Sequence, residues 1–146
     1  MRHILTGAAA LLLLVFAFAP ASVAQSEWRA LITGDAVAGY GVEGATLIDA
    51  AEAQALHARG VKFLDARSYG RWEQGHIAGA ISLRLDQLEE LAGRQEELVF
   101  YCGGTDCKLS ANACAYALTL GYENVYYFAG GYPAWTAADY AVETGS

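Results

Sequence analysis

Three cysteines lie close together in this chain, and their type and spacing are its clearest indication of chemistry. Cys102, Cys107 and Cys114 occupy one short stretch of a chain of 146 residues. A disulfide-stabilised scaffold usually has more cysteines, spread along the whole sequence. An odd number indicates a free thiol, or one disulfide with one cysteine left over. The clustering therefore predicts a reactive site rather than a structural framework.

Cys102 follows an apolar run that is typical of a buried strand, and a glycine-rich loop comes after it. Adjacent glycines let the backbone curl so that its N–H groups point inward. A helix capped by Ser110 would add further N–H groups and the positive end of its dipole. A thiol facing such a ring ionises readily and becomes nucleophilic, and the ring could also hold an anionic substrate. The alternative is a tight turn with an unreactive cysteine. The predicted substrate-binding loop consists of Gly103, Gly104, Thr105, Asp106, Cys107 and Lys108.

Strand-like and helix-like segments alternate on either side of this loop. Such alternation predicts an α/β fold built on an open, mainly parallel sheet flanked by helices. Ligands of open parallel sheets bind beyond the carboxyl ends of the strands, which is where Cys102 would lie. We expect strands at 61–65, 81–83, 98–101 and 125–128, helices at 49–59, 86–91 and 110–120, and a turn or short helix around Trp135.

The composition and the first residues indicate an exported single domain. The formal net charge of −7 argues against nucleic acid or an anionic membrane as a partner. An apolar run at 8–19 is shorter than the roughly 20 residues of a spanning helix, and small residues follow it. We therefore expect a signal peptide at 1–24, an N-terminal extension at 25–45, a domain at 46–146, and a periplasmic or secreted protein with no membrane contact after cleavage. The alternative is that the apolar run is a membrane anchor.

Several stretches of the sequence, taken together, resemble the signatures of the rhodanese family. They are residues 63–67 with 75–80, residues 99–102, and residues 121–125 with 130–135. The resemblance implies a rhodanese-like fold and a sulfurtransferase that uses thiosulfate or a persulfide as sulfur donor. Cys102 would take the sulfane sulfur, become a persulfide, and pass the sulfur to a thiol or another thiophilic acceptor, which could be carried on a protein. No cofactor is implied, and Cys102 and Cys107 with isolated histidines do not form a zinc set.

The loop departs from the family's usual pattern in two ways. It is about two residues longer, and it has no arginine, so that Lys108 is its only cation. Lysine cannot offer the bidentate fork of arginine, so a persulfide donor is at least as plausible as thiosulfate. Two other classes remain open: a non-catalytic binding or redox-sensing domain, and a cysteine phosphatase with Lys108 where its arginine would stand.

The second loop cysteine is expected to form a reversible disulfide with the first. Curvature of the loop could bring the Cα atoms of Cys102 and Cys107 within the roughly 4.4–6.8 Å that a disulfide requires. Alternatively, Cys107 could attack the Cys102 persulfide and release the sulfur as sulfide, which leaves the same bond, or it could merely pack the loop.

Other candidate residues are expected to support the site rather than react. The family resemblance implies that Arg67 pairs with Glu73 or another carboxylate, although it could also act as an active-site cation. Asp65 should position the backbone at a strand end, and His76 should be a hydrogen-bonded structural residue rather than a base. Cys114 has the spacing of a helix core position and should be buried and unreactive.

Overall fold

A computed structural model describes residues 41–145 of the chain. The expected signal peptide and most of the expected N-terminal extension lie outside the described residues. None of the helices between residues 41 and 145 has both the length and the apolar character needed to cross a membrane.

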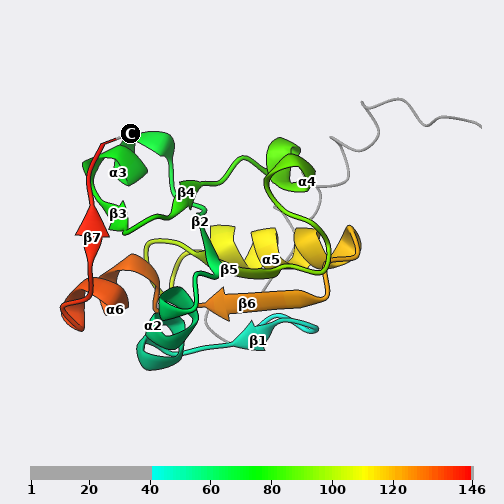
Figure 1. Ribbon diagram of the computed structural model, residues 1–146, viewed down its shortest axis with the longest axis horizontal. Helices are drawn as coiled ribbons and strands as arrows, with labels where there is room; N and C mark the ends of the chain where they lie inside the picture. The colour runs from blue at the N-terminus through cyan, green and yellow to red at the C-terminus, as the bar shows by residue number, and fades with distance from the viewer. Residues whose placement is uncertain (1–40, 146) are drawn as a thin grey trace, which may run out of the picture.

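The core of the molecule is a five-stranded, entirely parallel sheet (Figure 1). This confirms the predicted α/β class with a mainly parallel sheet. The strands follow the spatial order β1, β6, β5, β2, β4, so β5 is the central strand. Their bounds are Thr46–Leu47 for β1, Lys62–Asp65 for β2, Ile81–Ser82 for β4, Glu97–Tyr101 for β5 and Asn124–Phe128 for β6.

Helices cover both faces of the sheet, as Figure 1 shows. The helices α2 (Ala50–Ala58) and α6 (Gly131–Ala137) pack on one face, and α4 (Leu88–Leu91) and α5 (Leu109–Thr119) on the other. Successive side chains of a strand point to opposite faces. In β5, Leu98 and Phe100 accordingly join the core under α5, while Val99 and Tyr101 join the core under α2 and α6. The continuous apolar run of β5 is thus explained by burial on both faces.

The starts of helices α2 and α5 can be compared with the sequence, and one prediction about α5 is wrong. Helix α2 begins with a capping box, in which Asp49 accepts from the backbone of Glu52 and Glu52 accepts from the backbone of Asp49. Helix α5 starts at Leu109 with Lys108 at its N-cap. The prediction that Ser110 caps this helix is wrong, because Ser110 is buried inside the first turn.

Some elements were not predicted because they are short and lack a periodic pattern. The strand β1 completes one edge of the sheet. Helix α3 (Tyr69–Gln74) follows β2, and the predicted helix at 86–91 consists of a 3₁₀ turn (Leu85–Gln87) followed by α4. A separate antiparallel pair joins β3 (His76–Ile77) to β7 (Val142–Glu143), which fastens the C-terminal end of the described chain beside α3.

Candidate active site

Cys102 lies directly after the central strand β5, at the carboxyl end of the sheet. The neighbouring strand ends are in register with it, since Asp65 of β2 and Phe128 of β6 both pair with Tyr101. Cys102 is only 1% exposed. A seven-residue path from Cys102 to Lys108 then leads into α5. The structure therefore places Cys102 where the sequence predicted it.

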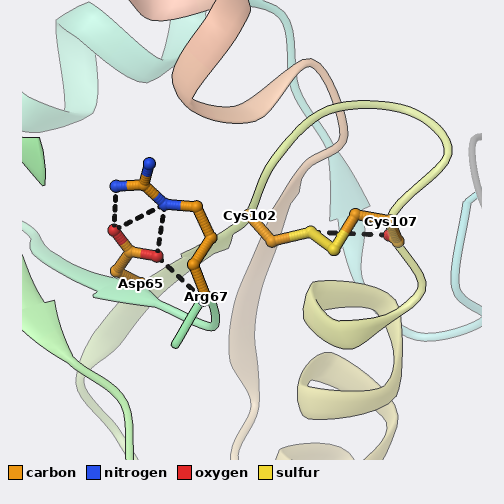
Figure 2. The surroundings of a disulfide bond; sticks show 4 residues. All are labelled: Asp65, Arg67, Cys102 and Cys107. Atoms are coloured by element: carbon orange, nitrogen blue, oxygen red, sulfur yellow. Dashed lines mark hydrogen bonds and ion pairs between the residues drawn. A yellow bond between two sulfur atoms is a disulfide. The ribbon is translucent and has the colours of Figure 1, made fainter. Parts of the chain in front are cut away.

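A disulfide joins Cys102 to Cys107 across this loop (Figure 2). Their Cα atoms are 6.4 Å apart, and the loop curls because the Cys107 N–H donates to the Gly104 carbonyl over 3.0 Å. Gly104 has a φ of +122°, which only glycine adopts readily. The expected pairing of the two loop cysteines is thus present in this structure.

One N–H group of the expected inward-facing ring is used within the oxidised loop. The Cys102 sulfur lies 3.6 Å from the carbonyl oxygen of Cys107, and the Cys107 N–H is used within the loop. This N–H is therefore not available to an anion in the disulfide form.

The start of α6 holds the loop from the opposite side. Tyr132 donates its backbone N–H to the Cys102 carbonyl over 2.9 Å. Gly131 has a φ of +56°, and a Cβ atom there would lie 2.2 Å from the Cys102 carbonyl oxygen. The glycine pair before Tyr132 therefore lets α6 approach the backbone of the reactive residue closely.

Replacing Gly131 with alanine should destabilise the domain and impair the site together. The left-handed backbone alone costs alanine about 1–2 kcal/mol, and the clash must also displace Cys102. Gly60→Ala is the matched control, since Gly60 has a φ of +80° with nothing within 4 Å of its Cβ position. Urea unfolding should show a clearly larger loss for Gly131→Ala than for Gly60→Ala. Equal losses would show that the close approach to Cys102 carries no energetic weight.

A buried ion pair lies beside the cysteine loop, as Figure 2 shows. Arg67 Nη2 lies 2.6 Å from Asp65 Oδ2, and the side chains are 8% and 0% exposed. Burial acts to lower the pKa of Arg67, but the hydrogen bond and charge of Asp65 outweigh it and raise the pKa. Arg67 also donates to the Gly75 carbonyl, and its guanidinium carbon lies 4.2 Å from the Tyr132 ring centroid. Arg67 is thus structurally paired, as expected, with Asp65 rather than Glu73 as its partner.

An open pocket of about 430 Å³ adjoins the disulfide. A second pocket of about 370 Å³ shares Arg67 and Arg71 with it. Cys107 lines the first pocket, whereas Lys108 is exposed and is not one of its lining residues. The predicted role of Lys108 as the loop's anion-binding cation therefore has no support from its position. The residues that line the pocket beside the disulfide include Arg67, Arg71, Gly103, Asp106, Cys107 and Leu109.

Arg71 is a candidate site residue that the sequence analysis missed. Its Nη1 atom lies 3.7 Å from the position of a Cβ on Gly103, so the guanidinium sits against the cysteine loop. Within residues 41–145 Arg71 has no ion pair, unlike Arg67. Arg71 lies on helix α3, which the sequence analysis did not predict.

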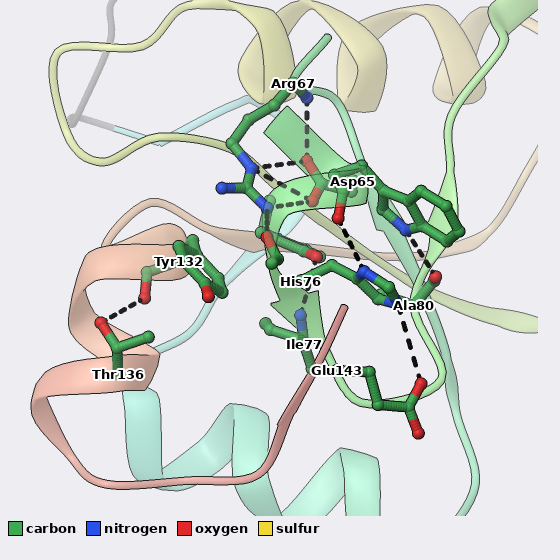
Figure 3. A network of polar contacts seen from close by, with 11 residues as sticks. Asp65, Arg67, His76, Ile77, Ala80, Tyr132, Thr136 and Glu143 are labelled. Atoms are coloured by element: carbon green, nitrogen blue, oxygen red, sulfur yellow. Dashed lines mark hydrogen bonds and ion pairs between the residues drawn. The ribbon is translucent and has the colours of Figure 1, made fainter. Parts of the chain in front are cut away.

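His76 and Cys114 have the structural positions expected of them. His76 is 3% exposed and donates from Nδ1 to the Trp72 carbonyl over 2.8 Å. Its Nε2 atom lies 3.7 Å from Oε2 of Glu143 in β7 (Figure 3). Cys114 is a free, buried thiol on α5, and burial raises its pKa. Between residues 41 and 145, no three His, Cys, Asp or Glu side chains gather so as to hold a metal ion.

The parallel sheet, the loop after its central strand and the motifs around them define a known class of domain. Residues 49–138 match the family model of the rhodanese-like domain. The chain belongs to the rhodanese-like domain family, which confirms the resemblance found in the sequence.

Three individual proteins are similar to this chain in sequence or in structure. The chain is 32% identical over 90 residues to the thiosulfate sulfurtransferase GlpE of Shewanella oneidensis, covering 59% of this chain and 86% of that protein. A rhodanese-like domain from Anabaena sp. has a TM-score of 0.60 at 23% identity, over 67% of this chain and 78% of that one, which shows the fold. A thiosulfate sulfurtransferase from Pseudomonas aeruginosa has a TM-score of 0.58 at 26% identity, over 71% of this chain and 21% of that one.

Proposed function

We propose that this domain is a sulfurtransferase in which Cys102 carries the transferred sulfur. The observation that supports this most is the position of Cys102 at the carboxyl end of the central strand, in a loop beside an arginine-lined pocket. The similarity to GlpE adds a relative that acts as a thiosulfate sulfurtransferase. The signal peptide expected at 1–24 would place the domain in the periplasm or outside the cell, where disulfides persist.

The proposed reaction starts from the reduced loop. The Cys102 thiolate attacks the outer sulfur of thiosulfate or of a persulfide donor. The sulfur–sulfur bond of the donor breaks, and sulfite or the donor thiolate leaves with the electron pair. A thiol acceptor then attacks the outer sulfur of the Cys102 persulfide, and the Cys102 thiolate leaves.

Intact mass measurements test this proposal directly. The reduced Cys107→Ser variant, which cannot form the disulfide, should gain one sulfur atom on Cys102 when it is freed of reductant and incubated with thiosulfate or a peptide persulfide. Cyanide should remove that sulfur as thiocyanate. The disulfide form should gain nothing from either donor. An unchanged mass of the reduced Cys107→Ser variant with both donors, or sulfur found only on Cys114, would contradict the proposal.

The pocket charges predict which residues govern the use of an anionic donor. Arg71→Ala should lower kcat/KM for thiosulfate about tenfold or more, because one charge-assisted contact is worth roughly 1.5–3 kcal/mol. Asp106→Asn should raise it, since the Asp106 carboxylate lines the same pocket. Lys108→Ala, which removes the same charge outside the pocket lining, is the matched control and should have a smaller effect.

Donor charge and salt separate this electrostatic role from a structural one. The effect of Arg71→Ala should shrink at high ionic strength, and it should be weaker with a peptide persulfide than with the thiosulfate dianion. Equal losses for Arg71→Ala and Lys108→Ala, or a loss independent of donor and salt, would remove Arg71 from the site.

The disulfide also favours a second candidate, a thiol redox domain without transferase activity. In this case Cys102 and Cys107 would cycle between dithiol and disulfide and no persulfide would form. The same mass measurements distinguish the two functions, because the redox domain gains no sulfur from any donor.

A further inference from the structure

The two loop cysteines are placed so that one can react with sulfur held on the other. Their sulfur atoms are bonded in this structure although the residues are only five positions apart. The bond is formed within the loop alone, since strand β5 runs up to Tyr101 and helix α5 begins at Leu109. A Cys107 thiolate would therefore meet Cys102 inside one short loop, which makes the reaction intramolecular and strongly favoured over attack by a dilute external thiol.

We propose that Cys107 discharges the Cys102 persulfide and releases its sulfur as hydrosulfide; this inference rests on the proposed function. The Cys107 thiolate attacks Sγ of Cys102, and a bond forms between the two cysteine sulfurs. The bond between Cys102 Sγ and the outer sulfur breaks, and the outer sulfur leaves with the electron pair and takes a proton from water. The two cysteine thiols are oxidised to the disulfide seen in the structure, and the sulfane sulfur is reduced to hydrosulfide.

The exposure of the two cysteines determines which sulfur an external reductant attacks when it reduces the disulfide. Cys102 is 1% exposed, whereas Cys107 is partly exposed and lines the open pocket. An external dithiol reductant therefore attacks Sγ of Cys107 and the Cys102 thiolate leaves. The second thiol of the reductant then displaces Cys107 and carries the disulfide away. Over one cycle, thiosulfate and a dithiol yield sulfite, hydrosulfide and an oxidised dithiol.

The third cysteine does not compete in this scheme. Cys114 is free and buried, and its sulfur lies 3.9 Å from the Tyr126 carbonyl oxygen, within the core under α5. The discharge is therefore assigned to Cys107 alone among the described cysteines.

A single-turnover experiment on the full-length reduced protein tests the discharge. With thiosulfate and no external thiol, the wild type should release about one equivalent of sulfide per protein and lose two free thiols to the Cys102–Cys107 disulfide. Cys107→Ser should release no sulfide and should instead keep one sulfur atom on Cys102, which cyanide removes as thiocyanate. Cys114→Ala is the matched control and should behave as the wild type does.

The outcomes separate this inference from the function on which it rests. A stable wild-type persulfide beside a free Cys107 thiol, or wild-type sulfide release by Cys107→Ser, would overturn the inference alone. Failure of Cys107→Ser to gain sulfur from thiosulfate or from a peptide persulfide would overturn both. Peptide mapping after brief exposure of the oxidised wild type to a small monothiol should place the mixed disulfide on Cys107, and an adduct on Cys102 would overturn the proposed direction of reset.

Discussion

Replacing Cys102 with serine should reduce sulfur transfer to the rate of the uncatalysed reaction while the domain keeps its fold. A serine hydroxyl ionises far less readily than a thiol and cannot hold a sulfane sulfur as a persulfide. The side chain is similar in size, and the Cys107 carbonyl oxygen lies 3.6 Å from the present sulfur, where it could accept from the hydroxyl. Under reducing conditions the loss of stability should therefore be about 1 kcal/mol or less.

Thiocyanate formation and urea unfolding, both measured under reducing conditions, check the two halves of this prediction. Cys114→Ala serves as the control for removing a buried thiol that does not belong to the loop. Near-normal turnover by a correctly folded Cys102→Ser variant would show that another residue carries the sulfur.

The largest effect on stability is expected from Asp65→Asn. This change leaves the Arg67 guanidinium, whose side chain is 8% exposed, without its charge partner. Breaking a buried ion pair in this way costs about 3–5 kcal/mol, which is a large share of the 5–15 kcal/mol that holds a typical domain folded. The cost should appear in urea unfolding as a lower midpoint at an unchanged slope.

An exposed pair of the same type provides the control. Asp86 lies 3.1 Å from Arg84, and both side chains are more than half exposed. Asp86→Asn should cost no more than about 1 kcal/mol. If Asp65→Asn lowered the free energy of unfolding no more than Asp86→Asn does, the buried Asp65–Arg67 pair would not stabilise the domain more than an exposed pair does.

The sheet and the reactive cysteine could be predicted because their signals are local. The run at 98–101 is apolar at every position, since β5 is buried on both faces, and a glycine-rich turn follows it. The pairing of Cys102 with Cys107 was also predictable, because five residues of curved loop bring the two Cα atoms within disulfide range.

What the sequence analysis missed depends on contacts between distant segments. The partner of Arg67 is Asp65, because that carboxylate is fully buried at the strand end while Glu73 is exposed on α3. Arg71 reaches the loop only because α3 folds back against it. The β3–β7 pair joins segments far apart in the chain, and two-residue strands carry no periodic pattern.

The contact between Gly131 and the Cys102 carbonyl has a consequence for reading mutational screens of this domain. The backbone of the reactive residue is packed against a glycine that has no side chain and belongs to helix α6. A side chain at position 131 would shift Cys102 without removing any reacting atom. In a screen scored by activity, such variants would be grouped with losses of the nucleophile. Only a parallel measurement of protein abundance or folding would reveal that position 131 sets the geometry of the sulfur carrier.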